Sequence, residues 1–173
     1  MSFTAAKRHH AKIGSHLRDG EDIYSLNKHA LGPGELAESE WLKAGLANPD
    51  MTKIREYRLK RVREKLVEFD CAGILLYDPL NIRYATDSTN MSLWTSHNAA
   101  RYALVMTEGP VIIFEFDAHE FLSNHNPLIT EVRHAVTYLY FTAGDKSKER
   151  AKIWASEIVD IVKEHGKGNK RLA

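Results

Sequence analysis

Hydrophobic residues make up 43% and charged residues 27% of the 173-residue chain, which is the composition of a globular protein with a buried core. The formal net charge is +1, so no global electric field attracts the chain to nucleic acid or to a membrane surface. The single cysteine, Cys71, excludes a disulfide framework, and no apolar run is long enough for a signal peptide or a membrane span. We therefore expect a cytoplasmic protein that binds neither nucleic acid nor membrane.

The N-terminal 34 residues differ in composition from the rest. Residues 1–34 are polar and rich in His and Lys, and Gly and Pro interrupt them at their end. This composition is typical of a flexible arm, and the alternative is an arm that packs on a partner subunit. The following segment fits a short helix over 35–46, with four apolar residues near one face: Leu36, Trp41, Leu42 and Leu46. We divide the chain into an arm, 1–34, and a domain, 35–173.

A long amphipathic helix is predicted after Asn48-Pro49-Asp50, with Asp50 as its N-cap. Its apolar stripe consists of Leu59, Val62, Leu66 and Phe69. Between residues 53 and 65, basic residues outnumber acidic ones on the other faces. The basic run fits either a nucleic-acid contact or a solvated helix face, and the nearly neutral chain without a paired aromatic platform favours the solvated face.

The remaining pattern predicts an α/β domain. Three apolar runs, 73–77, 102–106 and 110–116, fit core strands, and Glu108-Gly109 fits the hairpin turn between the second and the third. A fourth strand is predicted over 131–141, and short and long helices over 117–123 and 146–165. The buried stripe of the long helix is predicted to be Ile153, Trp154, Ile158, Ile161 and Val162, and residues 170–173 resemble the start of another strand. The expected fold is a mixed β-sheet flanked by helices.

Catalytic motifs are missing from this sequence. It contains no GxSxG, P-loop, GxGxxG or HExxH pattern. His119 and His125 lack a third ligand at metal spacing, and the carboxylates form no cluster. Cys71 fits a buried structural thiol better than a nucleophile, because no His or Asn is placed near it by the sequence. We expect no catalytic residue and no metal or other cofactor in this chain.

A short motif follows the first predicted strand: Asp78, Pro79, Asn81, Ile82 and Tyr84. This motif resembles the N-terminal domain of the creatinase/prolidase (pita-bread metallopeptidase) family. The polar run that follows it up to residue 105 and the sequence KGNKRLA after the last helix extend the resemblance over 35–173. The longer run looks closest to a bacterial subgroup of predicted Xaa-Pro peptidases, which also includes a metal-dependent lyase that cleaves dimethylsulfoniopropionate.

This resemblance implies more than a fold. In the family an α/β N-terminal domain precedes a pita-bread domain, which holds two divalent metal ions on two Asp, one His and two Glu. All five positions would lie beyond Ala173, so the C-terminal metal domain is expected to be absent here. Family members are commonly homodimers in which the N-terminal domain of one subunit closes over the active site of the other. The implied substrate is a small molecule or a dipeptide.

Residues 81–101 form a long polar segment between two predicted strands, and we expect a polar loop that serves as this closing element. The resemblance makes six of its residues candidates for substrate binding in trans: Trp94, His97, Asn98, Arg101, Asp87 and Tyr84. Trp94 offers an apolar ring, and His97, Asn98 and Arg101 can donate hydrogen bonds to a carboxylate.

Each candidate also has a structural alternative. Trp94 could plug a sheet edge while the polar groups cap turns. Tyr84 fits the core better than a site. Asp87 could cap a turn or pair with Arg83 or Arg101.

Three hypotheses follow. The first is the non-catalytic N-terminal domain of a dinuclear-metal Xaa-Pro peptidase or creatinase-like hydrolase, which contributes substrate capping and dimer contacts. The second is the same domain of a metal-dependent dimethylsulfoniopropionate lyase, with Trp94 facing the sulfonium cation. The third is a stand-alone binding module.

Overall fold

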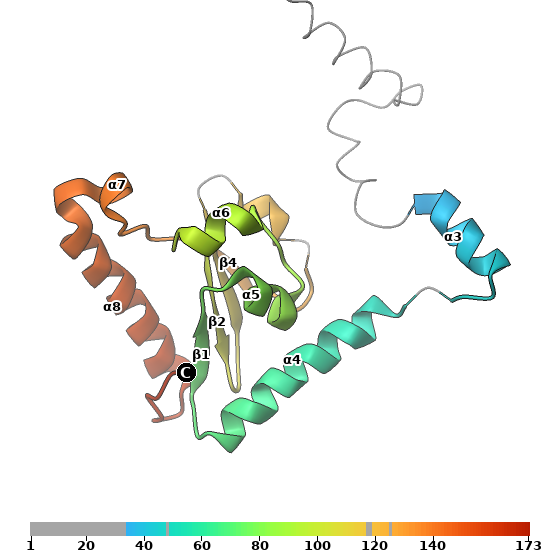
Figure 1. Cartoon of the computed structure of the whole chain (residues 1–173). Coiled ribbons are helices and arrows are strands. Elements are labelled where there is room, and N and C mark those ends of the chain that lie inside the picture. The colour runs from blue at the N-terminus through green and yellow to red at the C-terminus, as the bar shows by residue number, and fades with distance from the viewer. Residues whose placement is uncertain (1–33, 48, 117–118, 125) are drawn as a thin grey trace, which may run out of the picture. The chain divides into compact units, whose positions relative to one another are not determined.

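The computed structural model describes residues 34–173 except 48, 117, 118 and 125, so the predicted arm, apart from Gly34, lies outside the described residues (Figure 1). The chain divides into two units, Met1–Pro49 and Asp50–Ala173. Helix α3 (Gly34–Lys43) belongs to the first unit and agrees with the helix predicted from residue 35. All other described elements belong to the second unit.

Helix α4 (Met51–Glu68) begins where the sequence predicts it, because the side chain of Asp50 accepts a 3.0 Å hydrogen bond from the backbone N–H of Lys53. Leu59 and Leu66 are buried, as expected. Phe69 was predicted to extend this stripe and does not. The helix ends at Glu68, Phe69 caps it with non-helical dihedral angles, and 59% of Phe69 is exposed.

Four strands form one mixed sheet, as the sequence predicts. They are β1 (Gly73–Leu76), β2 (Tyr102–Met106), β3 (Val111–Glu115) and β4 (Glu131–His134), in the order β1-β2-β3-β4. The β1–β2 and β2–β3 pairs are antiparallel, and β3–β4 is parallel. The predicted start of a further strand is confirmed, because Leu172 pairs in parallel with Gly73 and the N–H of Ala173 donates to the Gly73 carbonyl.

The fourth strand is shorter than predicted. β3 ends at Glu115, and its carbonyl accepts the N–H of Ala135 as the last bond between these strands. Beyond that point the described residues provide no further neighbouring strand, so the alternation over 136–141 does not produce a strand. The chain instead forms the single turn α7 (Tyr140–Ala143) and the 3-10 turn η2 (Gly144–Lys146).

Helices cover both faces of the sheet (Figure 1). One face packs on α8 (Ser147–His165) through Leu104, Met106 and Ile112 with Ile158 and Ile161. The other face packs on α4 and α5 (Pro79–Thr86). In this second cluster Leu59, Ile82 and Ala85 come from the helices, and the strands contribute Leu76, Ala103, Val105, Val111 and Ile113. Alternate residues of β2 and β3 therefore face opposite layers. Ile153 of α8 is 52% exposed, so its assignment to the buried stripe was wrong.

Residues 81–101 do not form the expected loop. Their first part belongs to α5, which Asp78 caps by accepting a 2.8 Å hydrogen bond from the N–H of Asn81, with Pro79 in the first turn. A second helix, α6 (Ser92–His97), follows. The predicted helix over 117–123 is reduced to the 3-10 turn η1 (Glu120–Leu122), with residues 117 and 118 outside the described part.

The basic residues of α4 have partners within the domain. Arg63 donates to the carbonyls of Met106 and Gly109 at 3.2 and 2.7 Å and so ties the helix to the β2–β3 turn. The guanidinium of Arg58 lies 5.7 Å from the ring centre of Tyr84. These contacts give the basic face a structural role. None of the helices described here is long and apolar enough to cross a bilayer.

Candidate functional site on helix α6

The best candidate for a binding surface is the exposed face of α6. Trp94, His97 and Asn98 lie together there and, with Met91 and its two following residues, line a shallow hollow of about 540 Å³. Leu93 is 81% and Met91 47% exposed, so the hollow has an apolar rim. The structure thus brings together three of the six residues that the sequence singles out.

Aromatic packing fixes one side of Trp94. Its ring meets the ring of Phe116, the residue after β3, edge-on with centroids 5.3 Å apart. The row of rings continues through His119 to Phe121, with centroid separations of 5.6 and 6.3 Å. The side-chain amide of Asn98 donates a 2.9 Å hydrogen bond to the Trp94 carbonyl. The indole is half-buried. Phe116 packs against its ring, and Asn98 is hydrogen-bonded to the backbone of the same residue.

Arg101 lies in the interior. Its Nε and Nη2 are 2.9 and 2.8 Å from Oε1 of Glu115, and its Nη2 also donates to Oγ of Ser88 at 2.7 Å. The exposed fractions of Arg101 and Glu115 are 1% and 0%. Pairing offsets the two opposite charges, which would otherwise be costly to bury, although Nη1 of Arg101 is buried without a hydrogen-bond partner among the described residues. In this conformation the guanidinium contacts the protein and does not reach the α6 surface.

The other two candidates lie elsewhere. Asp87 ends α5 in a left-handed conformation (φ 56°) and pairs with Arg55 at 2.7 Å, so its partner is neither Arg83 nor Arg101. Tyr84 is 39% exposed, so its expected place in the core is wrong. It contributes to a second hollow instead.

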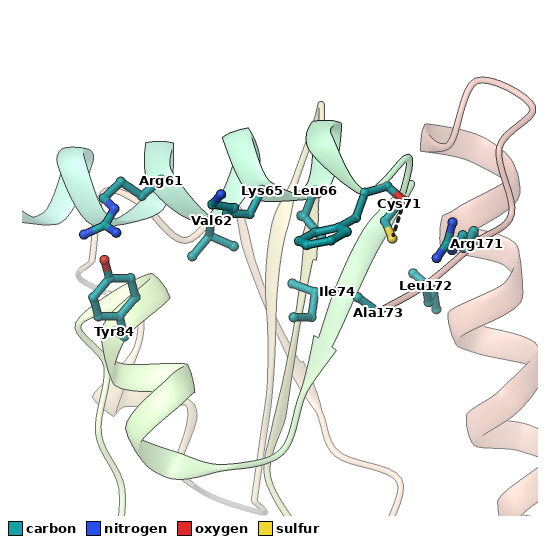
Figure 2. Close-up of a pocket in the computed structure, with 11 residues that line it drawn as sticks. Arg61, Val62, Lys65, Leu66, Cys71, Ile74, Tyr84, Arg171, Leu172 and Ala173 are labelled. Carbon is teal, nitrogen blue, oxygen red and sulfur yellow. Dashed lines mark hydrogen bonds between the residues drawn. The ribbon is translucent and has the colours of Figure 1, made fainter.

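That second hollow, of about 510 Å³, lies between α4, α5, β1 and the C-terminal residues (Figure 2). Val62, Leu66 and Ile74 form its apolar wall, and Tyr84 lies below Arg61 at one end (Figure 2). Cys71 also lines it; its thiol is buried and lies 3.6 Å from the Phe69 carbonyl, as expected for a structural cysteine.

The described residues do not fit a metal ion. No group of three or more His, Cys, Asp or Glu side chains in the described part of the chain lies close enough together to hold one. Burial raises the pKa of Tyr102, the neighbour of Arg101, far above its ordinary value, and the same cause raises the pKa of Tyr77. Both phenols are therefore neutral at physiological pH.

Residues that the sequence analysis missed organise this region. Glu115 accepts hydrogen bonds from Asn90 and Ser123 as well as from Arg101. The sequence did contain a signal for Glu115, because a single carboxylate in the apolar strand 110–116 must either face solvent or be paired. The hairpin register places it opposite Arg101, since Tyr102 pairs with Phe114.

Comparison with known proteins places the chain in a family. Residues 58–173 match the family described as Creatinase/Prolidase N-terminal domain. The chain is 46% identical to dimethylsulfoniopropionate lyase DddP of Roseovarius nubinhibens over 147 residues, which cover 85% of this chain and 33% of that protein. It is 39% identical to the protein of the same name from Roseobacter denitrificans over 171 residues, which cover 99% of this chain and 38% of that protein.

The chain therefore spans about a third of the length of these curated relatives. The family match begins at residue 58, within α4, and extends over the whole sheet and both helices of the segment 79–101. The chain belongs to the Creatinase/Prolidase N-terminal domain family.

Proposed function

We propose that this chain serves as the non-catalytic N-terminal domain of a dimethylsulfoniopropionate lyase. The observation that carries the proposal is the 46% identity with a lyase of that name over 85% of the chain. The family also takes its name from creatinase and prolidase, which keeps a hydrolase of a C–N bond as the second candidate. The two relatives, both lyases by name, favour the elimination reaction over hydrolysis.

The reaction needs groups that the described residues do not supply. Cleavage of dimethylsulfoniopropionate by β-elimination removes a proton from the carbon next to the carboxylate and breaks the carbon–sulfur bond. The bonding pair leaves with sulfur, and the products are dimethyl sulfide, acrylate and a proton. We assign the base, and any pair of divalent metal ions, to the part of a longer protein that this chain does not cover. The domain contributes binding.

The α6 face suits that role. The substrate carries a sulfonium cation, and a tryptophan ring attracts such a cation by about 0.5–2 kcal/mol. Trp94 is the half-buried aromatic ring of the hollow, and His97 is exposed beside it as a donor for a carboxylate. Because Arg101 is buried against Glu115, we assign the contact with the substrate carboxylate to His97 instead.

The rim of the same hollow supports a homodimer. Met91 and Leu93 expose apolar side chains beside Trp94, and such a surface favours contact with another protein surface. In the proposed dimer, α6 of one subunit closes over the active site of the other. Sedimentation of the longer protein should give a dimer, and Leu93→Asp should shift it toward monomer.

A chimaeric lyase tests the function. This chain replaces the matching N-terminal third of the Roseovarius nubinhibens protein, and headspace dimethyl sulfide is measured after addition of dimethylsulfoniopropionate. The chimaeric lyase should retain activity within about tenfold of its parent, which is about 1.4 kcal/mol of transition-state stabilisation. A correctly folded, dimeric chimaera without activity would contradict the proposal. Release of proline from an Xaa-Pro dipeptide by the longest product of the encoding gene would favour the hydrolase.

Trp94→Ala then tests the site. Loss of the ring should lower kcat/KM of the chimaeric lyase by about tenfold, the upper part of the cation–π range. Tyr140→Ala is the matched control, because Tyr140 is an aromatic residue 75% exposed on α7 and does not line the hollow. Equal losses in the two variants would exclude a specific contact by Trp94.

A further inference from the structure

Glu115 is bonded to both flanks of α6. Asn90 precedes the helix and donates from Nδ2 to Oε2 of Glu115 at 3.0 Å. Arg101 follows the helix and donates from Nε to Oε1 at 2.9 Å. Exposed fractions of 5%, 1% and 0% for Asn90, Arg101 and Glu115 place all three side chains in the interior. One carboxylate at the end of β3 thus holds the entry and the exit of α6.

The rest of the network holds this carboxylate in place. Ser123, after η1, donates from Oγ to Oε1 of Glu115 at 2.8 Å. Its hydroxyl also lies 2.7 Å from that of Ser88, which accepts the second hydrogen bond of Arg101. Buried polar networks of this kind fix a single arrangement because each missing bond leaves an unsatisfied group in a medium of low dielectric constant.

The backbone next to Asn90 requires such support. Met91, the N-cap of α6, has φ 26° and ψ 55°, backbone angles that residues other than glycine rarely adopt. Its side chain makes no capping hydrogen bond. Strained residues persist where the surroundings determine the conformation. A helix of six residues is also too short to be stable by itself. Both facts make the position of α6 depend on contacts outside the helix.

We infer that Glu115 is a positioning residue that fixes the orientation of α6 and, through it, the ring of Trp94 and the imidazole of His97. It acts through Asn90 and Arg101 and does not contact the substrate. Its effect on catalysis rests on the proposed lyase function, whereas its effect on the position of Trp94 does not.

The geometry provides variants that separate positioning from folding. In Glu115→Gln, the oxygen must remain at Oε1, where Arg101 and Ser123 donate, so the new NH2 group faces the NH2 group of Asn90. Two donors then meet and the bond is lost. Asn90→Asp in the same background supplies an acceptor and moves the negative charge by one side chain. Asn90→Ala removes this bond alone and leaves the Arg101–Glu115 pair intact.

The first experiment uses the 173-residue chain labelled with 5-fluorotryptophan, which gives one 19F signal for each of its three tryptophans, Trp41, Trp94 and Trp154. The Trp94 signal should shift and broaden in Glu115→Gln and in Asn90→Ala, and the double variant Glu115→Gln/Asn90→Asp should restore it. The Trp154 signal should stay in place. An unchanged Trp94 signal in both single variants would overturn the inference.

The control is Thr107→Val. It removes a hydrogen bond of 2.6 Å from Thr107 to the Cys71 carbonyl, at the opposite end of β2 from Arg101, and so lowers stability without touching α6. Its Trp94 signal should match that of the original chain. If this variant moved the Trp94 signal as far as Glu115→Gln does, the change would report general loosening and the inference would fail.

The second experiment uses the chimaeric lyase. Glu115→Gln should raise KM for dimethylsulfoniopropionate by about tenfold or more, because a small displacement of a binding group has a large kinetic effect. The double variant should recover the original KM, and Thr107→Val should keep it. A shifted Trp94 signal with an unchanged KM would overturn the positioning role in substrate binding. An inactive chimaera would instead count against the proposed function, and the 19F result would still decide the role of Glu115.

Discussion

Arg55 and Asp87 lie 32 positions apart in the sequence, yet Nε of Arg55 donates a 2.7 Å hydrogen bond to the carboxylate of Asp87. The contact joins α4 to the C-terminus of α5, the helix that leads into the α6 segment. It is partly shielded, with side-chain exposures of 33% for Arg55 and 13% for Asp87. Asp87 also adopts φ 56°, which aspartate tolerates better than most residues.

Substitutions at Asp87 separate these two contributions. Asp87→Gly removes the ion pair and relieves the backbone, and we expect it to lower the free energy of unfolding by about 1 kcal/mol. Asp87→Ala also loses the ion pair and places alanine at positive φ. We expect it to lower the free energy of unfolding by about 1 kcal/mol more than Asp87→Gly does. Urea unfolding measures both. Identical losses would show that the left-handed conformation contributes nothing.

The buried Arg101–Glu115 pair should dominate the stability of the region. Arg101→Met leaves the Glu115 carboxylate buried without its cation, and we expect a loss of about 3–5 kcal/mol in urea unfolding. Arg101→Met/Glu115→Leu should recover part of this loss, since no charge remains buried, whereas the buried side chains of Asn90, Ser88 and Ser123 still lose their partners. The control is Lys163→Met, because Lys163 pairs with Asp160 on the surface and such pairs contribute about 0–1 kcal/mol. Similar losses at the two positions would contradict the buried pairing.

Alkaline pH should unfold the domain through its buried tyrosines. The unfolded chain releases the Tyr102 proton near pH 10, whereas burial raises the pKa of the folded form well above that value. The stabilisation is therefore complete below about pH 10 and decreases above it, by about 1.4 kcal/mol per pH unit for one such group. Tyr102→Phe should reduce this slope when unfolding free energy is measured at several alkaline pH values. An unchanged slope would exclude Tyr102 as a cause.

Gly73 is predicted to be intolerant of any side chain. A Cβ there would lie 2.8 Å from the Val105 carbonyl oxygen and 3.0 Å from Sδ of Met106. Gly73→Ala should therefore force β1 and β2 apart and lower the free energy of unfolding by about 1–3 kcal/mol. Because the nearer contact is backbone, Met106→Ala in the same chain should not restore stability. Recovery in that double variant would assign the clash to the methionine side chain.

Local signals made most of the sheet predictable. The runs that form β1, β2 and β3 are apolar, the Glu108-Gly109 turn fixes the hairpin, and Asp50 caps α4. Each depends on residues adjacent in the sequence, so no tertiary information was needed. The motif that begins at Asp78 also carried the family assignment, which the match over 58–173 confirms.

The failures have a common physical origin in long-range contacts. The segment 131–141 alternates like a strand, but its neighbour β3 ends at Glu115 and leaves it unpaired beyond Ala135. The segment 81–101 has weak helical periodicity, and its helix α6 depends on buried bonds to Glu115 rather than on its own sequence. Arg101 resembled a ligand-binding residue because sequence alone does not show which side chains are buried.

The parallel pairing between Leu172 and Gly73 bears on how the domain can be shortened. Residues 171–173 cover backbone groups of Ala72, Gly73 and Leu75 with three hydrogen bonds between the two segments. A chain cut before Arg171 would leave β1 as an open strand edge with apolar side chains beside it, and such edges recruit other chains into intermolecular sheets. Soluble fragments of this domain should therefore keep these residues, and aggregation of a shorter fragment would reflect the loss of this cover.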